Sequence, residues 1–362
     1  MSNVQISVVM GVRNEAGHIE ELLADIAAQN LPKDQFEVII ADGESDDGTD
    51  DIIAHWMAEH PEIQAQLLHN SKRWQYPGVN MCIRQAQGKA MLVLDGHARI
   101  PADFLSNNLE VLEKSGAGVV GGFWDTQGAD STWGKAIEGA LSSWFGVGSA
   151  RFRIEGEPGP VDVVPFGCFR REVFERVGLY REALGSNADL DIFQRVHQAG
   201  FTVYLDSSIR ATYFARPNLQ SLARQMFRNG RWFPAHLKAT RPRHLAPLVF
   251  VLGLIGLPLL SLAWAPLIWV WGAMVGSYAV LSTVTAARIG ARLRNLDSGV
   301  RAAVVFPVMH LSYGLGWLAG FVSPDVWQAR YKGHAAPPQL KASPAMTGLP
   351  SEDSRLTFTG SG

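Results

Sequence analysis

The stretch Met91-Leu-Val-Leu-Asp95-Gly-His97 decides the fold of this 362-residue chain. Four apolar residues in a row predict a strand buried on both faces, which ends at a polar triplet. Ligands of open α/β sheets bind at the carboxyl ends of such strands. An acid and an imidazole two residues apart can both face a cation there, and Gly96 allows close backbone approach. A surface turn, in which Asp95 accepts local backbone N–H bonds, is the alternative interpretation.

The segments around this stretch alternate between strand and helix patterns. Short apolar runs that stop at polar turns predict buried strands over 6–10, 36–41, 63–68 and 90–94. Helical patterns follow the first three of these at 19–28, 49–59 and 78–86. The alternation predicts a parallel, doubly wound sheet, so Asn14, Asp42 and Asp95 are expected along one edge of it.

Common phosphate-binding motifs are absent from the sequence. No Gly-x-Gly-x-x-Gly follows the first predicted strand, and Gly88-Lys89 lacks the upstream glycine and the following Ser or Thr of a P-loop. A nucleotide would therefore be held by acidic strand ends and a metal. Cys82 and Cys168 are too few for a disulfide framework or a cysteine metal site.

The C-terminal third is predicted to attach the chain to a membrane. No charged residue occurs from Leu245 to Ala287, which is long enough for two transmembrane helices, and a third apolar stretch follows. The expected spans are roughly 245–264, 267–287 and 302–322. Met1-Ser-Asn-Val has neither a basic nor a long apolar region, so no cleaved signal is expected. We expect a cytoplasmic domain over 1–240, a membrane domain over 241–325 and a disordered tail over 334–362.

The net charge of -2 hides an excess of basic residues before the first apolar run: Arg210, Arg216, Arg224, Arg228, Arg231, Lys238, Arg241 and Arg243. Basic residues beside a span place that side in the cytoplasm. Arg224, Arg228 and Arg231 share one helix face, so an anion-binding face and an orientation signal are both open interpretations. These basic residues directly precede the first predicted transmembrane helix, so no nucleic-acid-binding module is expected. An odd number of spans would leave the tail outside, whereas Arg330 and Lys332 favour the cytoplasm.

The order of several motifs resembles a known family: Val12-Arg-Asn14-Glu15, Asp42-Gly-Glu-Ser-Asp-Asp-Gly-Thr49, Leu94-Asp95-Gly-His97, Phe145 to Arg151, Pro165 to Gly178 and Asn187-Ala-Asp189-Leu-Asp191. In this order they resemble the family 2 nucleotide-sugar glycosyltransferases, which have the GT-A fold. The chain is most similar to the membrane-bound glucosyltransferases of succinoglycan-type exopolysaccharide synthesis. The resemblance covers roughly residues 4 to 325.

The resemblance implies roles on the donor side of the site. Asp42 matches the acid that accepts from a uracil ring, and Asn14 and Glu15 match neighbours of the nucleoside. Asp95 and His97 match the family's metal motif, in a version that ends in His, and so imply a divalent cation, Mg²⁺ or Mn²⁺.

It also implies roles near the diphosphate and the acceptor. Asp189 matches the base that deprotonates the acceptor hydroxyl, with Asp191 as a neighbour. Arg228, Arg231 and Trp232 approximate a late motif near the diphosphate. Gln225 offers a second register for that motif.

One position departs from the family pattern. Close relatives carry two acids where this chain has Ala188-Asp189, and Leu190 replaces another commonly acidic position. The second acid of the pair is the one assigned the proton transfer, which favours Asp189. The alternative is that Asn187, Asp189 and Asp191 only cap and decorate a helix running to Ala199.

The expected activity is inverting transfer of a sugar from a UDP-sugar to a polyprenyl-diphosphate-linked saccharide, in exopolysaccharide or cell-surface glycan synthesis. The expected location is a bacterial-type inner membrane, with several spans and the catalytic domain in the cytoplasm. Transfer to polyprenyl phosphate itself is an alternative. A membrane nucleotide-sugar-binding protein that has lost catalysis is another, which Ala188 makes plausible.

Overall fold

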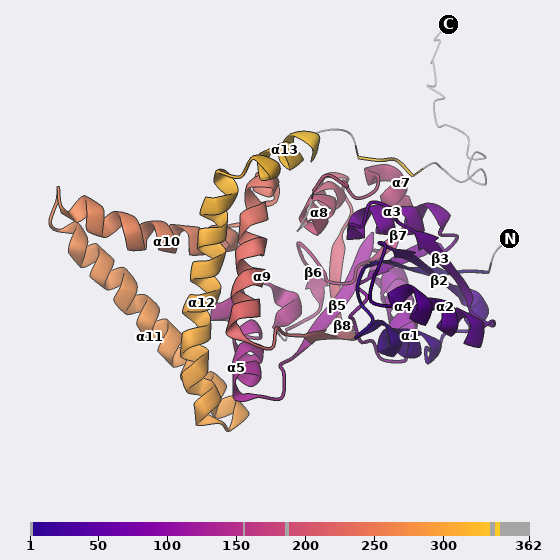
Figure 1. Cartoon of the computed structure of the whole chain (residues 1–362), viewed down its shortest axis with the longest axis horizontal. Coiled ribbons are helices and arrows are strands. Elements are labelled where there is room, and N and C mark those ends of the chain that lie inside the picture. The colour runs from indigo at the N-terminus through magenta and orange to yellow at the C-terminus, as the bar shows by residue number, and fades with distance from the viewer. Residues whose placement is uncertain (1–2, 155, 185–187, 334–336, 341–362) are drawn as a thin grey trace, which may run out of the picture.

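The computed structural model of the chain describes residues 3–154, 156–184, 188–333 and 337–340. The first two thirds form an α/β domain around an eight-stranded sheet in the order β3-β2-β1-β4-β7-β5-β8-β6. Long C-terminal helices extend from one side of this domain (Figure 1). The doubly wound α/β sheet predicted from the sequence is therefore present, and antiparallel pairings make it mixed and not wholly parallel.

Four neighbouring parallel strands form one half of the sheet: β1 (Ile6–Val12), β2 (Phe36–Asp42), β3 (Gln64–His69) and β4 (Ala90–Leu94). The helices between them are α1 (Ile19–Ala27), α2 (Thr49–Glu59) and α3 (Gln75–Gln85). Every residue of β1 and β2 is buried, as apolar runs in a sheet covered on both faces should be. Helix α3 begins three residues before the predicted Gly78, because Pro77 is tolerated in a first helical turn.

The other half of the sheet contains two short reversed strands, β6 of two residues and β7 of three. It consists of β5 (Val119–Gln127), β6 (Gly159–Pro160), β7 (Cys168–Arg170) and β8 (Val203–Phe214). Strand β7 is antiparallel to both β4 and β5, and β8 is parallel to β5. Consequently β5 and β8 run in the same direction as β4, and their carboxyl ends lie at the same edge of the sheet.

The helices of this half are α4 (Phe104–Ser115), α5 (Thr132–Leu141), α6 (Trp144–Val147), α7 (Arg171–Val177), α8 (Ala188–Gln198) and α9 (Leu219–Trp232). Short 3-10 turns lie at η1 (Lys33–Gln35), η2 (Arg151–Arg153) and η3 (Phe233–Ala239). Helix α9 stands between the sheet and the C-terminal helices (Figure 1).

Three C-terminal helices are long and apolar enough to cross a membrane: α10 (Pro242–Ser261), α11 (Leu267–Leu293) and α12 (Leu296–Phe321). Helix α11 continues past Arg288 and Arg292, since charged residues end an apolar run without ending a helix. Helix α12 begins six residues before the predicted 302, because the side chain of Asn295 caps it by accepting from the backbone N–H of Ser298 at 3.0 Å.

The chain returns to the α/β domain after α12 and the short helix α13 (Pro324–Gly333). The backbone N–H of Leu179 donates to the carbonyl of Pro338 at 2.7 Å, and Leu340 is 8% exposed within an apolar cluster. Residues 337–340 of the predicted tail thus contact the α/β domain, because Leu340 occupies an apolar site that composition alone does not reveal. The remainder of the predicted tail lies outside the described residues.

Candidate active site

The loops after β1 and β2 are tied together by polar side chains. Asn14 has a left-handed φ of 55°, and its side chain exchanges hydrogen bonds with Asp46: Nδ2 donates at 2.8 Å, and Oδ1 accepts from the Asp46 backbone at 3.1 Å. Asp42 is buried and accepts from both the backbone N–H and the hydroxyl of Ser45, at 3.0 and 2.6 Å. These bonds fix the shape of the edge where a nucleoside is predicted to bind.

The metal motif lies beside this edge, after β4. Asp95 and His97 line one cavity of about 180 Å³, together with Glu15 from the β1 loop and Gln75 from the start of α3. The Gln75 amide donates to Asp95 Oδ1 at 2.5 Å, and His97 Nδ1 lies 3.0 Å from Glu15 Oε1. The two predicted ligands are therefore together, and each is oriented by a side chain from another element.

The surroundings shift the ionisation of both side chains. The hydrogen bond to Glu15 raises the pKa of His97, while partial burial and the positive charge of Arg216 act in the opposite direction. Desolvation raises the pKa of Asp95. Arg216, just past the end of β8, places a positive charge near His97. In the sequence it is visible only as one of the basic residues before the first apolar run.

The donor atoms suit a divalent cation that also binds substrate. When Nδ1 of His97 donates to Glu15, Nε2 is left as a free lone pair, which is the usual carboxylate–histidine arrangement at metal sites. No group of three or more potential ligand side chains occurs among the described residues. One carboxylate and one imidazole therefore leave most positions of the ion for phosphate oxygens and water, as is common for Mg²⁺ in nucleotide sites.

Two carboxylates at the start of α8 have opposite surroundings. Asp189 is reachable from solvent, yet desolvation by the surrounding protein raises its pKa to about 6, and the negative charge of Asp95 adds to that rise. Asp191 is buried between Arg181 and Arg195, and the Arg195 Nε–Oδ2 distance is 2.9 Å. Asp189 is thus available for proton transfer, whereas Asp191 is held in ion pairs.

The missing acid of the family pattern falls at a packed position. Ala188 is completely buried as the first residue of α8, so its side chain faces the protein and not the cleft. The Ala188 replacement therefore leaves the solvent-facing position of Asp189 intact. Asn187 lies outside the described residues.

Two tyrosines accompany Asp189 and were not singled out in the sequence. Tyr76 on α3 and Tyr180 stack with ring centroids 4.9 Å apart. Desolvation raises the pKa of each well above its ordinary value, and the charges of Asp189 and Asp95 contribute to both shifts. Asp95 and Asp189, which are 94 positions apart in the sequence, thus face one site with these tyrosines.

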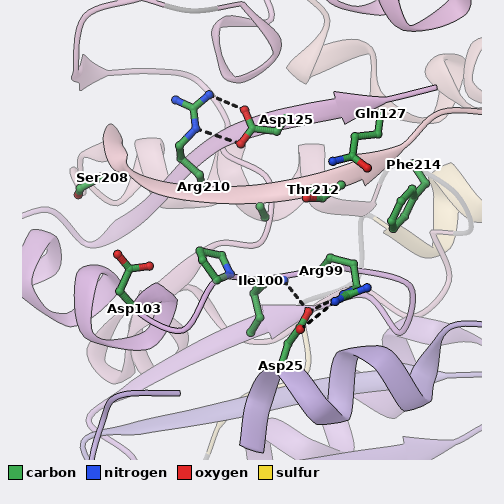
Figure 2. Close-up of a pocket in the computed structure, with 12 residues that line it drawn as sticks. Asp25, Arg99, Ile100, Asp103, Asp125, Gln127, Ser208, Arg210, Thr212 and Phe214 are labelled. Carbon is green, nitrogen blue, oxygen red and sulfur yellow. Dashed lines mark hydrogen bonds and ion pairs between the residues drawn. The ribbon is translucent and has the colours of Figure 1, made fainter. Parts of the chain in front are cut away.

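A second cavity, of about 550 Å³, opens between α1, the loop after β4 and the ends of β5 and β8 (Figure 2). Its charged side chains are largely paired: Arg99 with Asp25, and Arg210 with Asp125. The Phe214 ring stacks on His18, and the centroids of the His18 and His97 rings are 6.4 Å apart. This cavity therefore adjoins the metal motif through Phe214 and His18.

Comparisons with known proteins show which family the chain belongs to. Residues 7–178 match the family model described as glycosyl transferase family 2. The chain is 30% identical over 322 residues to the succinoglycan biosynthesis protein ExoA of Rhizobium meliloti, covering 87% of this chain and 93% of the relative. The chain belongs to glycosyl transferase family 2. The glycosyltransferase AglE of Haloferax volcanii is 26% identical over 226 residues, or 62% of this chain and 72% of that protein.

Two solved structures share the fold. The mannosyltransferase PcManGT of Pyrobaculum calidifontis, in complex with GDP-Man and Mn²⁺, superimposes with a TM-score of 0.53 at 19% identity, over 90% of this chain and 87% of that one. TarS residues 1–349 of S. aureus, in complex with UDP-GlcNAc, reach 0.50 at 15% identity, over 84% and 90%. The GT-A fold and the glycosyltransferase activity expected from the sequence are therefore confirmed.

The family match ends before α9. The residues of α9 that were predicted to bind the diphosphate have different partners in the structure. Arg231 pairs with Asp325 of α13 through two contacts of 2.8 and 2.9 Å, and its guanidinium lies 5.9 Å from the Trp232 ring. Arg228 is exposed, and no described carboxylate forms an ion pair with it. Gln225 donates to the hydroxyl of Tyr213 at 3.0 Å. Of the two arginines, Arg228 is the one available to an anionic ligand.

Proposed function

We propose that this family 2 enzyme is an inverting, metal-dependent transferase that moves a sugar from a UDP-sugar to a lipid-linked saccharide. The observation that carries the proposal is the pair Asp95 and Asp189. One carboxylate lies in a cation-binding cavity beside a histidine, and the other is solvent-reachable with a raised pKa. Carboxylates whose environments differ in this way suit separate roles in one reaction.

The donor side of the proposal rests on the strand ends. Asp42, Asn14 and Glu15 are proposed to contact the nucleoside, and Asp95 and His97 to hold Mg²⁺ or Mn²⁺. PcManGT binds GDP-Man with Mn²⁺ and TarS binds UDP-GlcNAc, which supports a nucleotide-sugar donor for this chain. The bound cation would neutralise the diphosphate charge that develops as the sugar leaves. Arg228 is proposed to add a positive charge beside the diphosphate, and Arg231 and Trp232 follow it on α9.

The acceptor side rests on Asp189. An acceptor hydroxyl oxygen forms a bond to the anomeric carbon while its proton passes to the Asp189 carboxylate. The bond from the anomeric carbon to the diphosphate oxygen breaks at the same time, and UDP carries away the electron pair. One displacement inverts the anomeric configuration. A base with a pKa near 6 is ionised at neutral pH and still basic enough to take the proton.

The lipid acceptor and the location follow from the C-terminal helices. We propose that residues 1–240 are the cytoplasmic catalytic domain and that 241–325 attach it to a bacterial inner membrane. Apolar helices inserted in a bilayer would bring the site close to the lipid surface, which suits an acceptor sugar on a polyprenyl diphosphate whose tail stays in the bilayer. The similarity to a succinoglycan biosynthesis protein supports a role in exopolysaccharide assembly.

The test is release of free UDP by the purified full-length protein, supplied with single UDP-sugars and with extracted lipid-linked saccharides. The proposal expects UDP release that needs both substrates and stops with Asp189→Asn. Turnover with polyprenyl phosphate alone would establish the alternative acceptor. Binding of UDP without any turnover, with every donor and acceptor tried, would indicate a binding protein that has lost catalysis.

A further inference from the structure

The first half of α12 belongs to the core of the catalytic domain. Its buried apolar side chains share one cluster with the apolar face of α5, which lies within the family match over 7–178. The cluster members from the two helices are Ala136, Ile137, Ala140, Leu141, Ala302, Val305, Phe306 and Met309. Of the most apolar stretch of α12, 39% is buried, against 11% for α10 and 6% for α11. Helix α12 therefore has protein on a side where a lipid-embedded span would have lipid.

The second half of α12 lies against α9 at backbone distance. A Cβ atom on Gly316 would come within 2.2 Å of the Phe227 carbonyl oxygen, and one on Gly230 within 2.1 Å of the Tyr313 carbonyl oxygen. Helix α9 carries the exposed cations Arg224 and Arg228. If α12 crossed the bilayer, its close packing would draw these charges toward the hydrocarbon, which is unfavourable.

The exposed side of α12 is an apolar stripe opposite the buried face. Leu296, Val300, Val304 and Leu315 are 83%, 62%, 46% and 46% exposed. At about 100° per residue these four fall on one face, roughly opposite Ala302, Met309 and their buried neighbours. A helix with protein on one face and an apolar stripe on the other suits a position along the membrane surface.

The chain that follows α12 contacts the catalytic domain at several points. After it, Asp325 pairs with Arg231, Arg330 donates to the Pro234 carbonyl at 2.9 Å, and Pro338 accepts from Leu179. By contrast, α10 and α11 extend away from the domain, and the loop that joins them forms a tip far from it (Figure 1). The tip, Leu262 to Pro266, has no charge, and Leu262 and Trp264 are 87% and 63% exposed.

We infer that α10 and α11 enter the bilayer as a hairpin, while α12 lies flat between the catalytic domain and the lipid surface. The stripe defined by Leu296, Val300, Val304 and Leu315 would contact lipid, continuous with the hairpin. The chain after α12 is then on the same side of the membrane as the catalytic domain. This arrangement differs from the third span expected over 302–322, and it agrees with the basic Arg330 and Lys332 beyond it.

The side of α13 tests this arrangement directly, whether or not the lipid acceptor is correct. The native thiols of Cys82 and Cys168 are buried, and burial raises the pKa of each to about 12, so they should not react. Single variants Gln328→Cys on α13 and Asp51→Cys on α2 place thiols at exposed positions. With an impermeant maleimide and vesicles of both orientations, both thiols should react in the same orientation. Reaction of Gln328→Cys only in the orientation opposite to Asp51→Cys would overturn the inference.

The depth of α12 provides a second measurement. Leu296→Cys and Val304→Cys, each carrying a polarity-sensitive fluorophore, stand eight residues apart on the stripe, or about 12 Å along the helix axis. Quenchers attached to lipids at defined depths should report equal, shallow positions for both. A deep Val304 label beside a shallow Leu296 label would show that α12 crosses the bilayer.

Discussion

Asp189 and Asp191 stand two residues apart on α8, which turns their side chains roughly 200° from each other. We expect Asp189→Asn to lower the rate of transfer by about a hundredfold or more, the scale of losing a general base, with UDP affinity nearly unchanged. Wild-type transfer should rise with pH through about 6, because Asp189 must be ionised to accept a proton. Single-turnover rates against pH and UDP binding by calorimetry measure both effects.

Asp191→Asn is the matched control for that variant. It weakens the ion pairs with Arg181 and Arg195, so it should lower the melting temperature while folded molecules keep most of their turnover. If Asp191→Asn were inactive and Asp189→Asn active, the assignment of the base would be wrong by two residues.

The cavity lined by Asp95 and His97 gives a second prediction at the scale of single residues. Asp95→Ala should abolish donor turnover and His97→Ala should reduce it severely, because each removes one of the two proposed protein ligands. A chelator should silence the wild type, and added Mg²⁺ or Mn²⁺ should restore it. Glu15→Gln should keep the ligands but lose the orienting carboxylate, which typically costs about 10–100-fold in metal affinity. Full wild-type activity in excess chelator would refute the metal assignment.

The sequence reveals residues that belong to continuous motifs better than residues brought together by folding. Asp95 and His97 follow one strand, so a single stretch of sequence is enough to predict that they lie close together. Gln75 reaches Asp95 from the start of another helix, and Tyr180 reaches Asp189 through a stack with Tyr76. No local pattern marks these three residues, because the packing of α3 on β1 and β2 and the stacking of Tyr180 on Tyr76 bring them to the site.

At the scale of elements, α9 distinguishes two arginines that the sequence treats alike. Arg228→Ala should weaken binding of UDP and of the donor, since no described carboxylate pairs with its guanidinium, and it should leave the melting temperature unchanged. Arg231→Ala should act mainly on stability, by about 1 kcal/mol or less, because its pair with Asp325 is partly exposed. Donor titrations and thermal unfolding of both variants measure the difference. Equal loss of donor affinity in both would support a shared phosphate site and the second motif register.

The α9–α12 contact gives a prediction about packing. Gly316→Ala would place a methyl group 2.2 Å from the Phe227 carbonyl oxygen, so the helices must move apart at a cost of roughly 1–3 kcal/mol. Gly272→Ala and Gly276→Ala on α11 meet no atom within 4 Å and serve as controls that should be neutral or slightly stabilising. Thermal unfolding in detergent measures all three. An unchanged melting temperature for Gly316→Ala would mean that α12 does not pack on α9 in this way.

Elements with long, regular patterns are predictable from the sequence, and short or context-dependent ones are not. The apolar runs of β1, β2 and β4 predict their strands to within two residues. Strand β7 has only three residues, too few to show a period, although its antiparallel pairing joins the two halves of the sheet. Apolar composition predicts α12 as a span, but its buried residues pack on α5 and α9, which composition does not indicate.

At the scale of the whole molecule, packing does not follow the division expected near residue 240. Helix α12 shares a core cluster with α5, and residues 337–340 return to the α/β domain. The α/β domain and the C-terminal segments that contact it are therefore expected to unfold together. Hydrophobicity along the sequence separates apolar from mixed segments, but long-range contacts of this kind leave no periodic trace in it.

The returning segment gives the last prediction, which concerns Leu340. This side chain is 8% exposed and packs in the cluster that contains Tyr180, next to the hydrogen bond from Leu179 to Pro338. Leu340→Ala should destabilise the catalytic domain by about 2–5 kcal/mol, the usual range for a buried leucine, and Gln339→Ala, at an exposed position, should not. Because Tyr180 stacks on Tyr76 beside Asp189, the same variant should lower transfer more than UDP binding. Thermal unfolding and transfer assays on the two variants decide the matter, and equal behaviour of both would show that the segment does not support the domain.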